Sequence, residues 1–192
     1  VESFIENDLP WLLTKDVAVI ANITGTSVEQ YVQMAERLAG TGVHLLEMNI
    51  SCPNVHEGGV AFGVKPESVY AITKAVKAAA KQPLIVKLTP NVSDITENAL
   101  AAEEAGADAI FIETMTDLYE AKAAVLAAKE VTKLPVFATM IFDDKGKLLT
   151  GGTVDSVVAM LEGLRVDALG VNCGLGPEQM KDILADILKV SS

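Results

Sequence analysis

The sequence predicts an α/β fold of six consecutive strand–helix units built around a parallel sheet. Short runs of branched apolar residues alternate with longer stretches whose apolar residues recur at helical spacing. Half of the 192 residues are hydrophobic and only 5% are aromatic, which is typical of strands buried on both faces beneath helices. Strict alternation favours parallel strands with right-handed crossovers, so we expect a partial or open barrel of the (βα), or TIM-barrel, type.

The six predicted strands share a short, β-branched, apolar pattern, and each is followed by a polar or glycine-containing turn and a helical segment. They are expected at residues 17–23, 45–50, 84–88, 109–113, 136–140 and 168–172.

Start signals for the helices support this alternation. Thr26 with Glu29 is the pattern of a capping box, and Thr153 is expected to open the helix that follows it. The first thirteen residues predict a short amphipathic lead-in, with Phe4 and Trp11 covering one end of the sheet.

Composition limits the function classes. We expect one α/β domain over residues 1–192. The formal charge of −11 argues against a nucleic-acid surface, which needs clustered Lys and Arg. No apolar run approaches the roughly 20 residues that span a bilayer, and no signal peptide is expected. Two distant cysteines do not suggest a disulfide scaffold, so a cytoplasmic location is expected.

Chemistry in parallel sheets of this kind sits at the carboxyl ends of the strands. Polar side chains end five of the predicted apolar strands, which predicts a lined pocket. They are Asn22, Asn49, Lys87, Glu113 and Asn172.

Two residues at these ends carry alternative interpretations. Cys52 follows a strand end beside Pro53, where a thiolate can accept a proton. A lone cysteine is equally typical of a small buried hydrophobe. Lys87 ends an apolar strand and needs an anionic or polar partner, which is either a ligand or a structural salt bridge.

Residues 1 to about 108 resemble the central part of a class 1B dihydroorotate dehydrogenase, an FMN-dependent (βα)8 barrel. The resemblance rests on Glu47-Met-Asn-Ile-Ser-Cys-Pro-Asn-Val55, Gly58-Gly-Val-Ala-Phe-Gly63 and Val86-Lys-Leu-Thr-Pro-Asn-Val92. It implies that flavin carries the redox chemistry and that the protein positions it.

The same resemblance implies roles for individual residues. Cys52 matches the catalytic base that removes the C5 proton of dihydroorotate. Asn49 and Asn54 match substrate ligands, and Asn22, Asn49 and Lys87 match residues that hold FMN.

From about residue 107 onward the chain is similar to the homocysteine-binding barrel of cobalamin-dependent methionine synthase. The matching stretches include residues 112–130 and 139–143 and Asp167-Ala-Leu-Gly-Val-Asn-Cys-Gly-Leu-Gly-Pro-Glu-Gln-Met180. This resemblance implies that Cys173 matches one of three zinc thiolates and that Glu113 matches a contact to the substrate amino group.

The two resemblances meet at residues 105–108, in a helix-to-strand turn that both families share. We therefore distinguish a dehydrogenase-like part, 1–108, from a methyltransferase-like part, 109–192. The sequence reads as a recombined, engineered chimera that serves as a barrel scaffold without native turnover. The alternative is an FMN-binding oxidoreductase of the dihydroorotate dehydrogenase type that uses Cys52 as its base.

Each resemblance also implies what is missing. The strands that bind the FMN phosphate are expected to be absent, and Glu113-Thr114 stands where an Asn-Thr pair is expected. No cofactor is therefore expected, any FMN binding should be weak, and one cysteine is too few for a tight zinc site. Open sheet edges predict self-association.

Overall fold

The computed structural model describes residues 1–51 and 58–192. The chain divides into two compact units, Val1–Ile110 and Phe111–Ser192. Within the described residues six strands form one sheet, hydrogen-bonded in the order β1-β2-β3-β4-β5-β6. Strands and helices alternate along the chain, so the predicted class of consecutive parallel (βα)-barrel units is confirmed.

The bounds of the elements follow the predicted alternation closely. The strands are β1 (Ile20–Ile23), β2 (Leu45–Asn49), β3 (Leu84–Lys87), β4 (Ala109–Met115), β5 (Val136–Met140) and β6 (Ala168–Val171). The helices are η1 (Phe4–Asp8), α1 (Leu9–Leu12), α2 (Val28–Leu38), α3 (Val60–Gly63), α4 (Pro66–Ala79), α5 (Ile95–Glu104), α6 (Leu118–Val131), α7 (Val154–Gly163) and α8 (Pro177–Val190).

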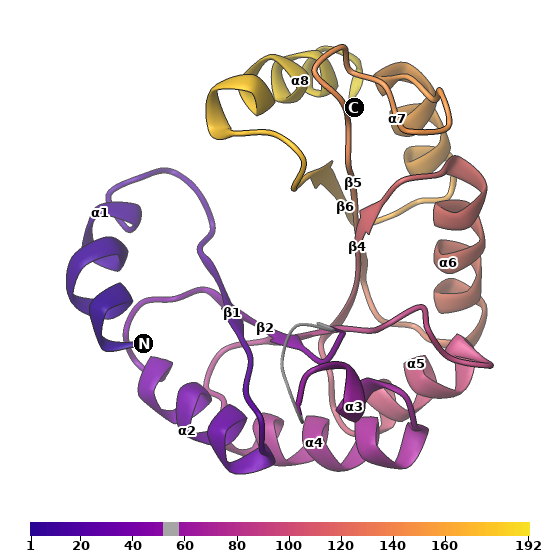
Figure 1. Ribbon diagram of the computed structural model, residues 1–192. Helices are drawn as coiled ribbons and strands as arrows, with labels where there is room; N and C mark the ends of the chain where they lie inside the picture. The colour runs from indigo at the N-terminus through magenta and orange to yellow at the C-terminus, as the bar shows by residue number, and fades with distance from the viewer. Residues whose placement is uncertain (52–57) are drawn as a thin grey trace. The chain divides into compact units, whose positions relative to one another are not determined.

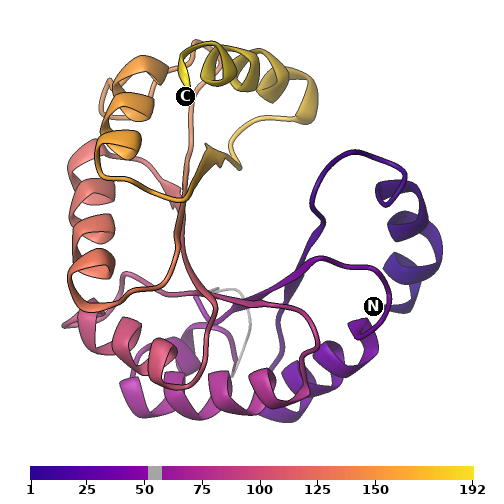
Figure 2. The ribbon, with the colours of Figure 1, turned by 180° about the vertical axis from the view of Figure 1, so that it is seen from behind.

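The first unit has its core between its strands and the helices α2, α4 and α5, which line one face of the sheet (Figures 1 and 2). Strand β2 pairs in parallel with β1 and with β3. Leu46, Met48, Ile85 and Val86 are fully buried. This packing places the carboxyl ends of β1, β2 and β3 at the same end of the sheet.

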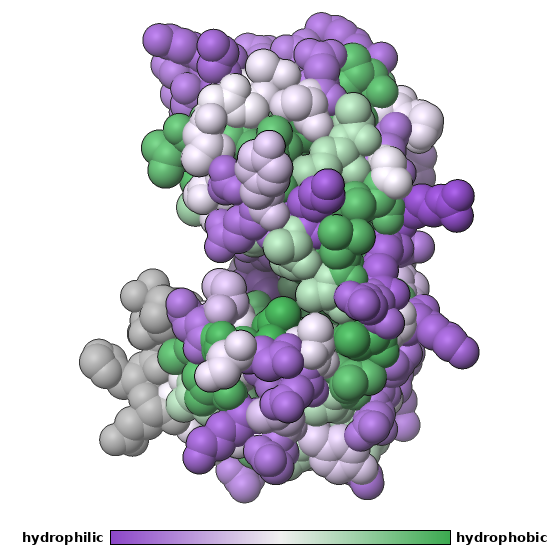
Figure 3. All heavy atoms as spheres, turned by 90° about the vertical axis from the view of Figure 1, so that its right-hand side faces the viewer, coloured by the Kyte–Doolittle hydropathy of each residue, from purple (hydrophilic) through white to green (hydrophobic). Residues whose placement is uncertain are grey.

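The second unit places α6, α7 and α8 against one face of its strands (Figure 1). Strands β5 and β6 pair in parallel. Val125, Met140 and Leu161 are fully buried in this core. The surface around α6 mixes apolar and polar side chains (Figure 3), and Tyr119 on α6 is exposed.

The helix caps confirm one prediction and correct another. Thr153 caps α7 in a capping box with Ser156. Helix α2, however, is capped by Ser27, whose side chain accepts the backbone N–H of Gln30. The expected capping box between Thr26 and Glu29 is therefore wrong, because the cap lies one residue further along the chain.

The lead-in segment is helical and its Phe4 is half-buried, but Trp11 is not buried as a residue covering the sheet would be. Trp11 is 61% exposed, and the Lys15 ammonium lies 4.5 Å from the centre of its ring. Leu9 is the residue of this segment that packs into the core, at 2% exposed. The first strand also begins later than expected, at Ile20.

One contact recurs where a helix returns to a strand. The Asp108 carboxylate accepts the N–H of Leu84 at 2.6 Å, and the N–H of Asp108 donates to the Leu84 carbonyl at 2.8 Å. Asp167 makes the same pair with Val136, at 2.8 and 2.9 Å. Each aspartate thus joins the start of one strand to the start of its neighbour in the chain.

Candidate functional site

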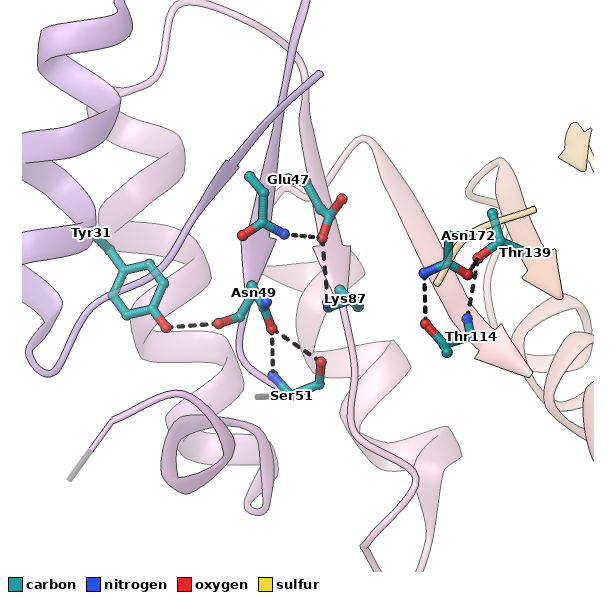
Figure 4. A network of polar contacts seen from close by, with 9 residues as sticks. Tyr31, Glu47, Asn49, Ser51, Lys87, Thr114, Thr139 and Asn172 are labelled. Carbon is teal, nitrogen blue, oxygen red and sulfur yellow. Dashed lines mark hydrogen bonds and ion pairs between the residues drawn. The ribbon is translucent and has the colours of Figure 1, made fainter. Parts of the chain in front are cut away.

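A polar cluster of Asn22, Glu47 and Lys87 lies at the carboxyl ends of β1, β2 and β3. Asn22 and Glu47 are direct partners in the sheet register, and the Asn22 amide donates to the Glu47 carboxylate. The Lys87 Nζ lies 3.6 Å from Oε1 of Glu47 (Figure 4). The side chains of Lys87 and Glu47 are only 12% and 7% exposed. The predicted strand-end lysine therefore has a carboxylate partner within the protein.

Asn49 lies two residues beyond Glu47 and is partnered with Lys87 in the register of β2 and β3. Its backbone carbonyl accepts the hydroxyl of Tyr31, a fully buried residue on α2, at 2.7 Å. Its Oδ1 accepts the N–H and hydroxyl of Ser51 at 3.3 and 3.1 Å (Figure 4). These contacts fix both the backbone and the amide of Asn49, so its Nδ2 donor has a defined direction.

The structure therefore brings Asn22, Asn49 and Lys87 together at neighbouring strands of the first unit. Cys52 and Asn54, the expected base and second substrate ligand, lie outside the described residues.

Sequence reasoning missed Glu47, which the structure puts at the centre of the cluster. The signal was present, because a carboxylate interrupts the apolar run 45–48. A buried carboxylate needs a charged or hydrogen-bonding partner, and Lys87 and Asn22 are the polar residues at the neighbouring strand ends.

A second polar cluster, of Thr114, Thr139 and Asn172, closes on itself at the ends of β4, β5 and β6. The Thr114 N–H donates to the Thr139 hydroxyl at 3.1 Å, and that hydroxyl donates to Asn172 Oδ1 at 2.9 Å. The Asn172 amide donates to the Thr114 hydroxyl at 2.7 Å (Figure 4). Asn172, predicted as a strand-end residue, thus acts as a link within the cluster.

Thr114 has a backbone φ of 66°, which is uncommon for any residue with a Cβ and unfavourable for a β-branched one. Such a conformation persists only where surrounding contacts hold it, and it occurs often at functional sites. The cluster with Thr139 and Asn172 supplies these contacts. The preceding residue, Glu113, is half-buried at the end of β4.

Cys173 follows β6 with a φ of 61° and is exposed as a free thiol. Among residues 1–51 and 58–192, no group of three or more His, Cys, Asp or Glu side chains is arranged to hold a metal ion. Cys173 is thus the single candidate zinc ligand in this region that the sequence had named, and the described residues around it add no three-ligand metal group.

Asp117 caps α6 just beyond the end of β4 and accepts the N–H groups of Tyr119 and Glu120 at 2.8 and 2.9 Å. The Glu120 N–H, together with the Thr150 hydroxyl, holds the pKa of the Asp117 carboxyl below its usual range. This carboxylate is engaged in starting a helix, which is a structural role.

The fold and the strand-end residues define a protein of the (βα)-barrel class. Family comparison divides it in two. The dihydroorotate dehydrogenase family model matches residues 1–134, and the homocysteine S-methyltransferase model matches residues 91–192. The chain therefore belongs to the dihydroorotate dehydrogenase family over its first part and to the homocysteine S-methyltransferase family over its last.

The relatives differ in how far they match. The catalytic subunit of dihydroorotate dehydrogenase B (NAD(+)) from Thermoanaerobacter sp. (strain X514) is 40% identical over 185 residues, which cover 96% of this chain and 58% of that protein. The corresponding subunit from Caldicellulosiruptor bescii is 56% identical over 110 residues, 57% of this chain and 36% of that protein. The chain thus spans about a third to three fifths of these two relatives.

Solved structures support the fold. The apo form of the homocysteine methyltransferase MmuM from Escherichia coli superposes with a TM-score of 0.66 at 17% identity, over 96% of this chain and 82% of that one. A dihydrodipicolinate synthase from Agrobacterium tumefaciens gives 0.60 at 18% identity, over 80% and 54%. At these identities the likeness concerns the fold alone. None of the helices in the described parts of the chain combines the length and the apolar character that a bilayer span requires.

Proposed function

We propose that this chain is a (βα)-barrel scaffold of mixed parentage that turns over neither family's substrate. One observation carries the proposal. The ends of β1 to β3 bear residues of the dehydrogenase type, whereas β4 carries Glu113-Thr114 just before its last residue, within the overlap of the two family matches. Each family's characteristic residues are therefore present at the ends of some strands and replaced at the ends of others.

The replacement changes the charge at the end of β4. By resemblance, a dehydrogenase of this type has an Asn-Thr pair there, next to an anionic substrate and an electron-rich flavin. The Glu113 carboxylate would repel both. On the methyltransferase side, zinc activation of a thiol needs a set of protein ligands, and the described residues near Cys173 do not supply one.

Binding without turnover is the second candidate, and the cluster at β1 to β3 favours it. Asn22, Asn49 and Lys87 present amide and ammonium donors, which fit the polar edge of an FMN ring. FMN would supply the redox chemistry, these residues would hold it, and Cys52 would be the base in an active enzyme. We propose that any such binding is weak and that zinc is not bound.

Purified protein is expected to show no dihydroorotate-dependent dye reduction, with or without added FMN, and no methylation of homocysteine. A complete dihydroorotate dehydrogenase B assayed in parallel provides the positive control. Turnover at ordinary enzyme rates that is lost in Cys52→Ala would refute the scaffold proposal and support the oxidoreductase. A flavin absorbance spectrum without turnover would support the binding candidate.

We also propose that the chain self-associates through its sheet edges. Strand β6 is last in the strand order, and each of its residues retains some exposure. Helix α8 next to it exposes Leu184 and Leu188, four residues apart on one face. Unpaired strand edges and contiguous apolar surface favour association with another chain.

Multi-angle light scattering is therefore expected to give a mass at least twice the 20.3 kDa of the chain at micromolar concentration. Leu188→Lys puts a charge on the apolar face of α8 and should shift the mass towards 20.3 kDa. The matched variant Leu126→Lys, on α6, should leave it unchanged. A monomeric wild-type protein at all concentrations would contradict self-association.

We further propose that the recombination is engineered and that the protein acts in the cytoplasm without a nucleic-acid or membrane partner. A junction in a helix-to-strand turn supports the first point, because it preserves the local geometry of the sheet. The charge of −11 supports the absence of a nucleic-acid partner. A natural genomic locus encoding the continuous chain would contradict the engineered origin.

A further inference from the structure

We propose that Glu47 sets the charge of the Asn22–Glu47–Lys87 cluster and thereby excludes small inorganic anions from it. The inference deepens the binding candidate above by naming the residue that determines which ligands the cluster accepts. The exclusion of inorganic anions stands without the binding candidate. Only the binding of a neutral ligand rests on it.

Lys87 alone would make an attractive anion site. Its side chain is 12% exposed at the end of β3, and a poorly hydrated ammonium favours a negatively charged partner. Glu47 supplies this partner at 3.6 Å and is itself 7% exposed. The protein thus carries its own anion at the place where a phosphate or sulfate would otherwise bind.

The position of Glu47 is fixed by the sheet. Asn22 and Glu47 face each other in the register of β1 and β2, and the Asn22 amide donates to the same Oε1 that faces Lys87. These two contacts hold the carboxylate from two sides. Glu47 therefore stays at the cluster rather than turning away to admit a second anion.

Glu47 and Lys87 carry opposite charges, and the Asn22 amide adds a neutral donor to the same carboxylate. A dianion would bring negative charge towards the buried Glu47 carboxylate, whereas a neutral ligand brings none.

Calorimetric titration with inorganic phosphate tests the inference without any flavin. We expect no saturable binding to wild-type protein at millimolar phosphate. Glu47→Gln keeps the shape of the side chain, removes its charge, and should bind phosphate at least tenfold more tightly. The double variant Glu47→Gln/Lys87→Gln should lose this gain. Glu36→Gln, at an exposed position on α2, removes the same charge away from the cluster and should behave as wild type.

Equal phosphate affinity in wild type and Glu47→Gln would overturn the inference. If circular dichroism shows that Glu47→Gln does not fold, wild type and Lys87→Gln decide the matter. If wild type binds phosphate and Lys87→Gln does not, the role of Glu47 is contradicted. If neither protein binds phosphate, that role is supported. Quenching of riboflavin fluorescence separately tests the binding candidate, because riboflavin is neutral. No quenching would refute that candidate and leave the phosphate comparison valid.

Discussion

Removing one member of the buried Glu47–Lys87 pair is expected to lower the free energy of unfolding by about 3–5 kcal/mol, because the other charge stays buried and loses this opposite charge. Lys87→Met and Glu47→Gln are the single variants. The low exposure of both side chains is the reason for the size of the effect. Chemical denaturation monitored by circular dichroism measures it.

The double variant Lys87→Met/Glu47→Gln is expected to be more stable than either single variant, because it removes both charges of the pair together. An exposed pair serves as the control. Lys189 and Asp186 are 2.6 Å apart on the surface of α8, and Lys189→Met should change stability little. Equal losses at the buried and the exposed pair would show that Glu47 and Lys87 are hydrated in solution.

The order and type of the elements could be predicted from the sequence because both rest on local patterns. Runs such as 84–88 and 136–140 gave strands within a residue or two of the observed bounds. The strand at 17–23 was predicted too long, because its first residues are apolar but Val17 and Ala18 stay exposed ahead of β1. Periodicity in the sequence indicates which residues are apolar, but it does not predict which strands pair with each other.

The candidate site was predicted in part. Polar residues at strand ends could be located from the sequence, because parallel strands bring their carboxyl ends to the same end of the sheet. The residues with which they form hydrogen bonds and ion pairs could not be predicted. Lys87 pairs with Glu47, which lies 40 positions earlier inside an apolar run, and Asn172 bonds Thr114 across 58 positions. Such contacts depend on the sheet register, which a single sequence does not reveal.

The last prediction concerns the aspartates that join neighbouring strand starts. In the first unit, Asp108 accepts the N–H of the fully buried Leu84 and pairs with Lys77 on α4. In the second unit, Asp167 accepts the N–H of the fully buried Val136 and lies 3.4 Å from Lys129 on α6. The two sites are equivalent in geometry, although the first lies at the proposed junction and the second within the methyltransferase-like part.

Asp108→Ala and Asp167→Ala are each expected to cost about 1–3 kcal/mol of stability, because a buried strand N–H loses its acceptor. Asp108→Asn and Asp167→Asn should cost less, since an amide oxygen still accepts the N–H. Lys77→Met and Lys129→Met remove only the partly exposed ammonium and should cost about 0–1 kcal/mol. Urea denaturation of the six variants gives the comparison.

The matched design makes the result informative about the junction. Equal losses at Asp108 and Asp167 mean that the turn at the junction contributes as much stability as a turn inside one family's part. The recombined sheet is then held by a contact that depends on backbone geometry and one carboxylate, whatever the parentage of the strands. If Asp108→Ala leaves the free energy of unfolding unchanged while Asp167→Ala lowers it, the hydrogen bond from Leu84 to Asp108 at the turn of residues 105–108 is not formed in solution.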